Sequence, residues 1–165
     1  MVTISNSSPL ILYASIGRLE LLHRLFGELI VPASVYDEVV VKGAEKPGAA
    51  AVVASPWIRT RAAADRQMVG TLQQQVDPGE AEAIALAIEI GEQAVVLIDD
   101  RKGRRLARER DFEMVGSAGV LLLAKERGLI SRVGPLLDEL RAAGLRLSDR
   151  AYREVLLDAG EPPDD

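Results

Sequence analysis

The sequence predicts one α/β domain in which helices cover both faces of a parallel sheet. Short apolar segments typical of strands alternate along the chain with longer segments of helical periodicity. One strand segment, residues 94–98, is apolar throughout, as in a strand that is buried on both faces. Because parallel neighbours need helical crossovers, this alternation predicts a doubly wound sheet, and the length of 165 residues suits a single domain.

Two strands and their helices are expected in the N-terminal part. Val2–Ile4 is the first strand, and Pro9 lies in the first turn of the helix that follows Asn6. Leucines at helical spacing continue to Phe26, with Gly17 as a break between two segments. The next expected elements are a strand at 29–31, a helix from Pro32 through Val40, a loop at 42–47, a short helix rich in alanine and valine, and a minor strand at 57–58.

The helix after residue 76 has a clear start signal. Asp77 and Glu80 have the spacing of a capping box, and the helix is expected to run to residue 90, where Gly91 ends it. The remaining expected elements are the strand at 94–98, a basic helix to Arg110, a strand at 113–115 and helices at 118–127, 132–143 and 149–158. We assign residues 1–158 to the domain and residues 159–165 to a disordered acidic tail.

The composition narrows the compartment and the kinds of metal site. The chain has no cysteine, which excludes disulfides and thiolate ligands and favours the cytoplasm. A metal would then be held by oxygen or by the imidazole of His23, which is expected to be an ordinary residue on the surface of a leucine-rich helix. No apolar stretch approaches the ~20 residues of a membrane span, and no basic leader precedes an apolar segment.

A cluster of basic residues stands out because the formal net charge is −5. A nucleic-acid ligand needs a local basic patch on such a chain. The cluster consists of Arg101, Lys102, Arg104, Arg105, Arg108 and Arg110. On a helix, Arg101, Arg104, Arg105 and Arg108 share one face that can meet a phosphate backbone. The alternative is a solvated face whose arginines pair with Glu109 and Asp111.

Polar side chains follow the predicted strands, at the end of an open α/β sheet where binding sites form. Asn6 and Ser8 follow the first strand, Asp99 and Asp100 follow the buried strand, and Glu38 lies on a mostly apolar helix after the second strand. A fourth candidate is Glu82 or Glu80, near the start of the alanine-rich helix. Converging carboxylates without cysteine suit Mg²⁺ or Mn²⁺, and such a metal can activate water for attack on a phosphate. The sequence therefore indicates an acidic metal site.

Several of these acids also have structural explanations. Asp99 and Asp100 can cap the basic helix, and Glu80 can be the capping-box partner of Asp77. Glu38 and Glu82 have apolar neighbours at helical spacing, which makes a plain surface role less natural for both.

Six sequence blocks resemble, in order, the signature blocks of PIN-domain proteins. They cover residues 6–11, 31–39, 79–87, 97–104, 115–121 and 124–130. The resemblance is to a PIN-like branch of unknown function that is related to VapC-type toxins, and it extends from Val2 to Leu157. It implies a three-layer α/β/α sandwich whose acidic cluster binds Mg²⁺ or Mn²⁺ and hydrolyses RNA. It also implies a homodimeric toxin that is held silent by an antitoxin protein.

The resemblance assigns the site residues by position. Asn6 takes the first acidic place and Ser8 is its hydroxyl companion, Glu38 is the second acid, Glu82 or Glu80 the third, and Asp99 or Asp100 the fourth. Glu82 and Asp100 are favoured. Arg101, Arg104 and Arg105 are expected to hold the RNA backbone.

The chain departs from the wider PIN pattern at Asn6, where an aspartate is usual. An amide oxygen can ligate a metal, but the change removes one negative charge and weakens binding of a hard cation. This departure favours a second hypothesis, a catalytically weakened PIN-like protein that binds RNA or a partner. A phosphoryl-transfer or receiver domain is a third, weakened because neither an acidic motif after the first strand nor a glycine-rich phosphate loop is found.

Overall fold

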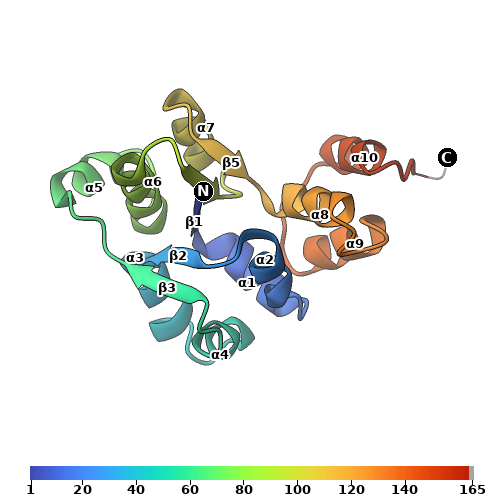
Figure 1. Cartoon of the computed structure of the whole chain (residues 1–165), viewed down its shortest axis with the longest axis horizontal. Helices are drawn as coiled ribbons and strands as arrows, with labels where there is room; N and C mark the ends of the chain where they lie inside the picture. Colours follow the sequence, from blue (N-terminus) through green and yellow to red (C-terminus); the bar gives the residue numbers. More distant parts are fainter. Residues whose placement is uncertain (164–165) are drawn as a thin grey trace.

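A five-stranded parallel sheet lies at the centre of the computed structural model, which describes residues 1–163 (Figure 1). The strands are β1 (Val2–Ser5), β2 (Leu29–Pro32), β3 (Ile58–Arg61), β4 (Ala94–Leu97) and β5 (Glu113–Val115). Their order across the sheet is β3-β2-β1-β4-β5, and each neighbouring pair is parallel. The predicted parallel sheet is therefore confirmed.

Helices pack on both faces of this sheet and form two separate apolar cores. The helices are α1 (Ser7–Ser15), α2 (Leu19–Phe26), α3 (Ala33–Tyr36), α4 (Pro47–Val53), α5 (Arg66–Leu72), α6 (Pro78–Ile90), α7 (Arg101–Glu109), α8 (Ser117–Glu126), α9 (Gly134–Ala142) and α10 (Asp149–Asp158). Side chains of β4 alternate between the cores. Val96 packs with α5, α6 and α7, whereas Leu97 packs with α1, α2 and α8. This confirms the expected three-layer α/β/α sandwich.

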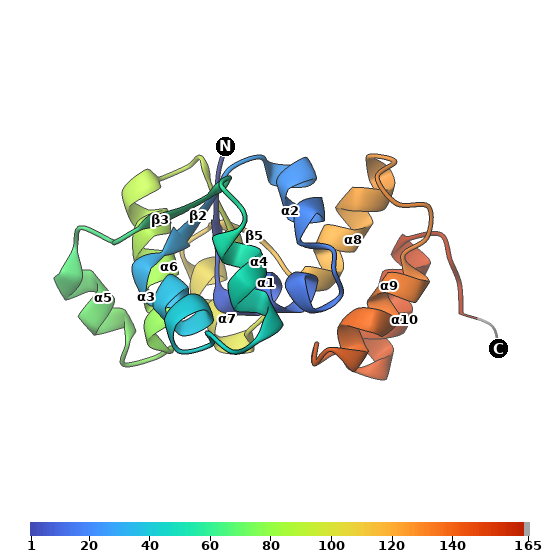
Figure 2. The ribbon, with the colours of Figure 1, turned by 90° about the horizontal axis from the view of Figure 1, so that it is seen from below.

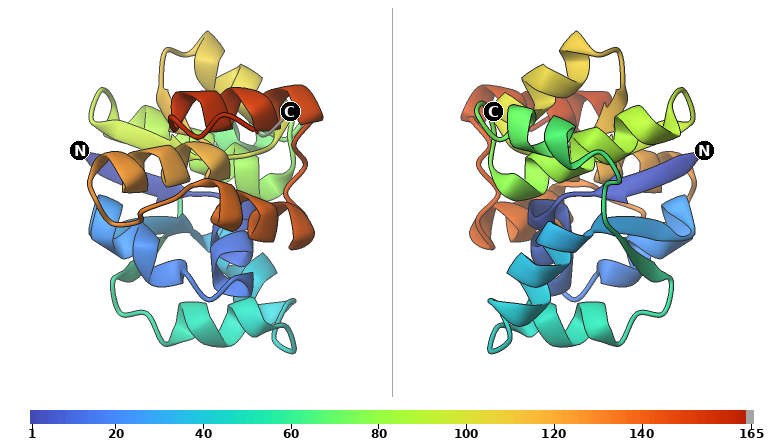
Figure 3. Two further views of the ribbon diagram at one scale, coloured as in Figure 1. Left: turned by 90° about the vertical axis from the view of Figure 1, so that its right-hand side faces the viewer. Right: turned by 90° about the vertical axis from the view of Figure 1, so that its left-hand side faces the viewer.

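Different helices lie at the two ends of the long axis of the molecule. Figure 2 shows α5 at one end and α9 and α10 at the other, and Figure 3 shows these two ends face on. Of the residues that the structure describes, no helix is both long and apolar enough to cross a bilayer.

The structure differs from the sequence-based expectation in two elements. No helix is predicted between the minor strand and Asp77, but α5 lies there and is capped by Asp65, whose carboxylate accepts the N–H of Met68 (2.9 Å). The helix expected from Pro32 through Val40 is α3 continued by a π-helical segment, η1 (Asp37–Val41). Such π-helical turns are rare, and they are frequent at functional sites.

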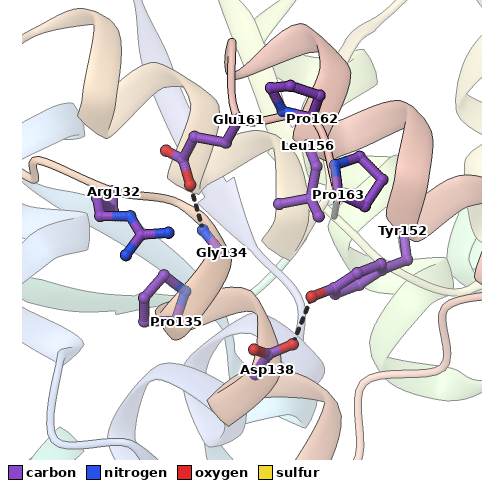
Figure 4. A pocket seen from close by; sticks show the side chains of 9 residues that line it. All are labelled: Arg132, Gly134, Pro135, Asp138, Tyr152, Leu156, Glu161, Pro162 and Pro163. Atoms are coloured by element: carbon purple, nitrogen blue, oxygen red, sulfur yellow. Dashed lines mark hydrogen bonds between the residues drawn. The ribbon is translucent and has the colours of Figure 1, made fainter. Parts of the chain in front are cut away.

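The segment after α10 packs on the fold through Glu161, although a disordered tail is expected from residue 159. The Glu161 carboxylate accepts Lys125 Nζ (2.7 Å) and the N–H groups of Val133 (2.7 Å) and Gly134 (2.9 Å). Figure 4 shows it over the start of α9, beside a cavity of about 360 Å³. A partly buried carboxylate with three donors fixes the chain at this point, so the free tail expected from the sequence does not begin at residue 159. Asp164 and Asp165 lie outside the described residues.

Candidate metal and nucleic-acid site

The candidate site lies at the topological switch point of the sheet, between the neighbouring strands β1 and β4. From β1 the chain continues to β2 and β3 on one side, and it later returns to β4 and β5 on the other. The crevice beyond the carboxyl ends of such neighbouring strands is the usual ligand position in open α/β sheets. Here the N–H of Asn6 donates to the carbonyl of Leu97 (3.0 Å), which joins the ends of β1 and β4.

Asn6 has a buried side-chain oxygen without a partner. The residue is 3 % exposed, and its side chain makes no capping hydrogen bond to α1 although it occupies the N-cap position. Among the described residues no donor reaches Oδ1. Leaving a buried acceptor unpaired costs about 1–3 kcal/mol. A donor or a cation at this oxygen would remove that cost.

Gly79, in the first turn of α6, lies close to the same oxygen. A Cβ atom on Gly79 would lie 3.3 Å from Asn6 Oδ1 and 3.0 Å from Val35 Cγ2. A side chain at this position would therefore crowd both the amide oxygen and Val35, and glycine avoids these contacts.

Asp99 is held by hydroxyl groups and by a backbone N–H. Its Oδ1 accepts the N–H of Ser117 (2.7 Å), and its Oδ2 accepts the hydroxyls of Ser117 (2.6 Å) and Ser8 (3.1 Å). Asp99 thus anchors the start of α8, and it does not cap the basic helix. Tyr13 donates to the Ser117 carbonyl (2.7 Å), and burial together with the negative charge of Asp99 raises the pKa of its hydroxyl.

Asp100 caps the basic helix α7, as the structural alternative proposed. Its Oδ2 accepts the N–H groups of Lys102 (2.9 Å) and Gly103 (3.1 Å). Both of these bonds go to Oδ2, so Oδ1 has no donor among the described residues. A capping carboxylate of this kind keeps one oxygen available as a ligand.

Glu80 is a nearly buried carboxylate, 5 % exposed, in the first turn of α6. The predicted capping box is confirmed, because Asp77 Oδ1 accepts the N–H of Glu80 (2.8 Å) and Glu80 Oε2 accepts the N–H of Asp77 (3.4 Å). Burial, and then the negative charges of Asp77 and Asp100, raise the pKa of Glu80 to about 7. A cation beside this carboxylate would reverse the shift.

These groups line one cavity of about 520 Å³, which we call the acid cavity. Its walls are Asn6, Ser7, Ser8, Asp77, Glu80, Asp99, Asp100, Arg101, Gly144, Leu145 and Arg146. Four acidic residues, two arginines and Asn6, the residue with the unpaired amide oxygen, thus line the same space. This combination suits a bound cation with an anionic ligand above it.

Glu82 and Glu38 do not line the acid cavity, although the sequence assigns both to the site. Glu82 is 1 % exposed and accepts the N–H of Ala33 (3.0 Å) and Arg66 Nη1 (3.3 Å), so it joins α6 to the start of α3 and to α5. Glu38 lies on the surface of η1 next to Ser7 and Asp77 of the cavity wall, and partial desolvation of its carboxylate, followed by the charge of Asp77, raises its pKa. Of the two candidates for the third acid, the structure brings Glu80 and not Glu82 to the cavity.

The three arginines expected to hold RNA are directed to three different places. Arg101 lines the acid cavity. Arg104 donates to the carbonyl of Ile98 (3.1 Å) and lines a neighbouring cavity. Arg105 pairs with Glu109 (3.2 Å) along the exposed face of α7, as the alternative interpretation of the basic face proposed.

The loop between α9 and α10 brings residues to the acid cavity that the sequence does not indicate. Gly144, Leu145 and Arg146 lie in this loop, more than 40 residues after Asp100 in the chain. No motif surrounds them, and their position depends on the packing of α9 and α10 against α8. The only feature of the sequence that could indicate Arg146 is its positive charge outside the basic cluster on α7.

The donors fit a cation that keeps part of its water shell. In the described part of the chain, no three acidic or histidine side chains are grouped closely enough to hold a metal by themselves. Mg²⁺ is commonly bound through one or two carboxylates with waters and substrate oxygens in the other positions. Asn6 Oδ1 and the free oxygens of Glu80 and Asp100 match that demand, and a closed cage of carboxylates does not.

Comparison with models of protein families identifies the family of the chain. A family model described as a PIN domain matches residues 2–161, which extends from β1 to Glu161. No curated protein and no solved structure matches the chain. The match covers the whole sheet and every residue of the acid cavity. The chain therefore belongs to the PIN-domain family, whose members are generally nucleases.

Proposed function

We propose that the protein is a Mg²⁺- or Mn²⁺-dependent endoribonuclease that hydrolyses RNA phosphodiesters at the acid cavity. The observation that carries the proposal is the buried Asn6 Oδ1, which has no donor among the described residues and belongs to a residue that lines a cavity with four carboxylates. An unpaired acceptor among carboxylates is disfavoured without a positive neighbour, and a divalent cation is one that a nuclease uses.

Asn6, Glu80 and Asp100 would hold the metal, and Asp99 would take part through Oδ1. A bound Mg²⁺ or Mn²⁺ supplies an activated water and neutralises charge on the phosphate under attack. Glu80 must lose its proton to bind, and its pKa of about 7 places that step in the physiological range. Ser8 and Ser117 keep the Asp99 carboxylate in place through their hydroxyls. Glu38 and Glu82 are left outside this ligand set.

Arg101 and Arg146 would bind the RNA backbone at the wall of the cavity. Arg101 stands at the start of α7, where the helix dipole adds partial positive charge to that of the guanidinium. Arg146 lies on a different element, so the two side chains can contact separate phosphates. This provides local attraction in a chain whose net charge is −5.

The finer biological role is also a proposal, based on the resemblance to VapC-type toxins. It comprises a toxin of a toxin–antitoxin pair, an antitoxin protein as partner, a homodimer and a cytoplasmic location. Co-purification with the product of an adjacent gene, together with growth arrest on expression of this chain alone, would test the toxin role.

The activity is tested by incubating purified protein with labelled structured RNAs in Mg²⁺, in Mn²⁺ and in EDTA. Asp99→Ala is a poor test variant, because it also releases α8. Glu80→Gln and Asp100→Asn keep the shape of each side chain and are preferred, with Glu109→Gln on the exposed face of α7 as the control. We expect cleavage in either metal that is lost in EDTA and in both site variants but kept in the control.

The alternative function is a catalytically weakened protein that binds RNA or a partner, and Asn6 favours it. Asn6→Asp restores the negative charge that is usual at this position in the wider family. If the natural protein is inactive on all RNAs tried and Asn6→Asp creates metal-dependent cleavage, the alternative is supported. If both proteins cleave RNA, the proposed nuclease stands and Asn6 is an active ligand.

A further inference from the structure

A second cavity of about 610 Å³ adjoins the acid cavity, and we call it the side cavity. The two cavities share Asp99, Leu145 and Arg146 in their walls. The side cavity extends from there between the edge strand β5 and helices α8 and α10, of which α8 and α10 lie side by side in Figure 1. It is therefore a continuation of the acid cavity toward the edge of the sheet.

The charges of the side cavity are divided between its two ends. Arg146 is shared with the acid cavity, is exposed and makes no ion pair with any described residue. Arg104 lies near the same end, because a Cβ on Gly116 would be 2.8 Å from Arg104 Nη1 and 3.3 Å from Asp99 Oδ1. Glu113 and Glu126, which also line the cavity, repel phosphate. Asp99 carries a negative charge at the arginine end, but its carboxylate is held by Ser8 and Ser117, and the two arginines outnumber it there.

The floor of the side cavity is apolar. It is formed by Leu122 and Leu123 of α8, Met114 of β5 and Val155 of α10. Apolar walls with a few charged groups are typical of pockets that enclose one small ligand, and 610 Å³ lies in their size range. A ligand with one flat apolar part and one anionic part matches this surface, and both parts occur in a nucleotide.

We propose that the side cavity binds one unpaired nucleobase of the RNA next to the scissile phosphate, with Arg146 on the linking phosphate and Arg104 behind it. The inference rests on the proposed nuclease function and adds a base-binding subsite to it. A base enters such a cavity only when it is free of pairing and stacking, so the target is a single-stranded segment or a loop. Arg146 is then a specificity residue that connects base binding with the acid cavity.

Binding of fluorescently labelled pentaribonucleotides, measured by anisotropy in EDTA, tests the phosphate contact without any cleavage. We expect Arg146→Ala to weaken binding about tenfold and to lower the slope of log K against log salt by about 0.7, the value for one lost phosphate contact on a single strand. Arg146→Lys should keep the slope. Arg153→Ala, an equal loss of charge on exposed α10, is the control and should change neither quantity.

Abasic substitution at each of the five positions tests the base contact. We expect one position at which removal of the base weakens binding severalfold. Ala118→Leu places a larger apolar side chain in the wall of the side cavity and should abolish this difference. A melting temperature within a few degrees of the natural protein shows that the variant is folded.

The inference is overturned if Arg146→Ala and Arg153→Ala bind alike, if no abasic position matters, or if a duplex binds as well as the single strand. Binding of no RNA at all also overturns it. These results differ from failure of the proposed nuclease, which is absence of metal-dependent cleavage. Cleavage without an Arg146 effect removes only the side cavity from the mechanism.

Discussion

Two glutamates that are wholly or partly buried in different parts of this molecule have opposite pKa shifts. Burial alone would raise the pKa of Glu161, but hydrogen bonds from Lys125 and from the N–H groups of Gly134 and Val133 lower it to about 2. Glu80 has one long hydrogen bond from the Asp77 N–H and two negative neighbours, and its pKa rises to about 7. The number of hydrogen-bond donors, rather than burial, therefore separates a structural carboxylate from one that needs a ligand.

Substitution of Glu80 and of Glu161 should differ most in the effect on RNA cleavage. Glu80→Gln should reduce metal-dependent RNA cleavage about 10²-fold or more, since it removes a charge at the proposed metal. The measurement is single-turnover cleavage of a labelled RNA at saturating protein. Glu161→Gln should cleave at the natural rate under conditions where both variants are folded, and an equal loss in the two variants would contradict the comparison.

The next effect separates them by stability. Glu161→Gln should lower the free energy of unfolding by about 2 kcal/mol, the scale for hydrogen bonds to a charged group, because three donors lose their anionic acceptor. Urea denaturation gives this quantity. Glu154→Gln is the control, because it breaks an exposed pair with Arg150 (3.1 Å) and should cost less than about 0.5 kcal/mol. Equal costs for the two variants would show that Glu161 does not fix the segment after α10.

A smaller effect, on metal affinity, tests whether Asn6 Oδ1 is a ligand while every proposed metal ligand is kept. Gly79→Ala puts a methyl group 3.3 Å from Asn6 Oδ1, so we expect the affinity for Mn²⁺ to fall about tenfold in calorimetry. A tenfold change corresponds to about 1.4 kcal/mol. Gly70→Ala in α5 meets no atom within 4 Å and is the matched control. Unchanged affinity in Gly79→Ala would exclude Asn6 Oδ1 as a ligand.

The smallest effect is the pH dependence of stability. The pKa of Glu80 is raised above the ordinary value of 4.5, so its contribution is full below about pH 4.5 and is lost as pH rises through about 7. The metal-free protein should therefore lose on the order of 1 kcal/mol between pH 5 and 8 relative to Glu80→Gln. The contribution of Glu161 is present above about pH 4.5 and is lost as pH falls through about 2. Parallel pH profiles for the natural protein and Glu80→Gln would refute the assignment.

Local signals in the sequence predicted most of the fold. The capping box of Asp77 and Glu80, and Gly91 with a φ of 83°, fixed both ends of α6, and the apolar strand identified β4. Helix α5 was not predicted, because its stability depends on packing of Val69 and Leu72 against α6. The order of strands likewise depends on pairing between distant segments.

The candidate site could be predicted only as far as strand ends determine it. Asn6, Asp99 and Asp100 follow β1 and β4 directly, and the structure brings them to one cavity. The choice between Glu80 and Glu82 depends on Ala33 of α3 and Arg66 of α5, which donate hydrogen bonds to the Glu82 carboxylate. No local pattern reports such long-range partners, and none indicated Arg146.

Because the unpaired oxygen of Asn6 lies inside the folded chain, a cation that binds it should raise the stability of the fold. A ligand that binds only the folded chain adds RT ln(1 + [L]/Kd) to stability, about 2.7 kcal/mol at a hundredfold excess over Kd. Thermal denaturation in a series of divalent ions can thus rank the metals before any RNA substrate is known. In the same scan, Gly79→Ala distinguishes ions that reach the amide oxygen from ions that screen surface charge, because only the former lose their effect.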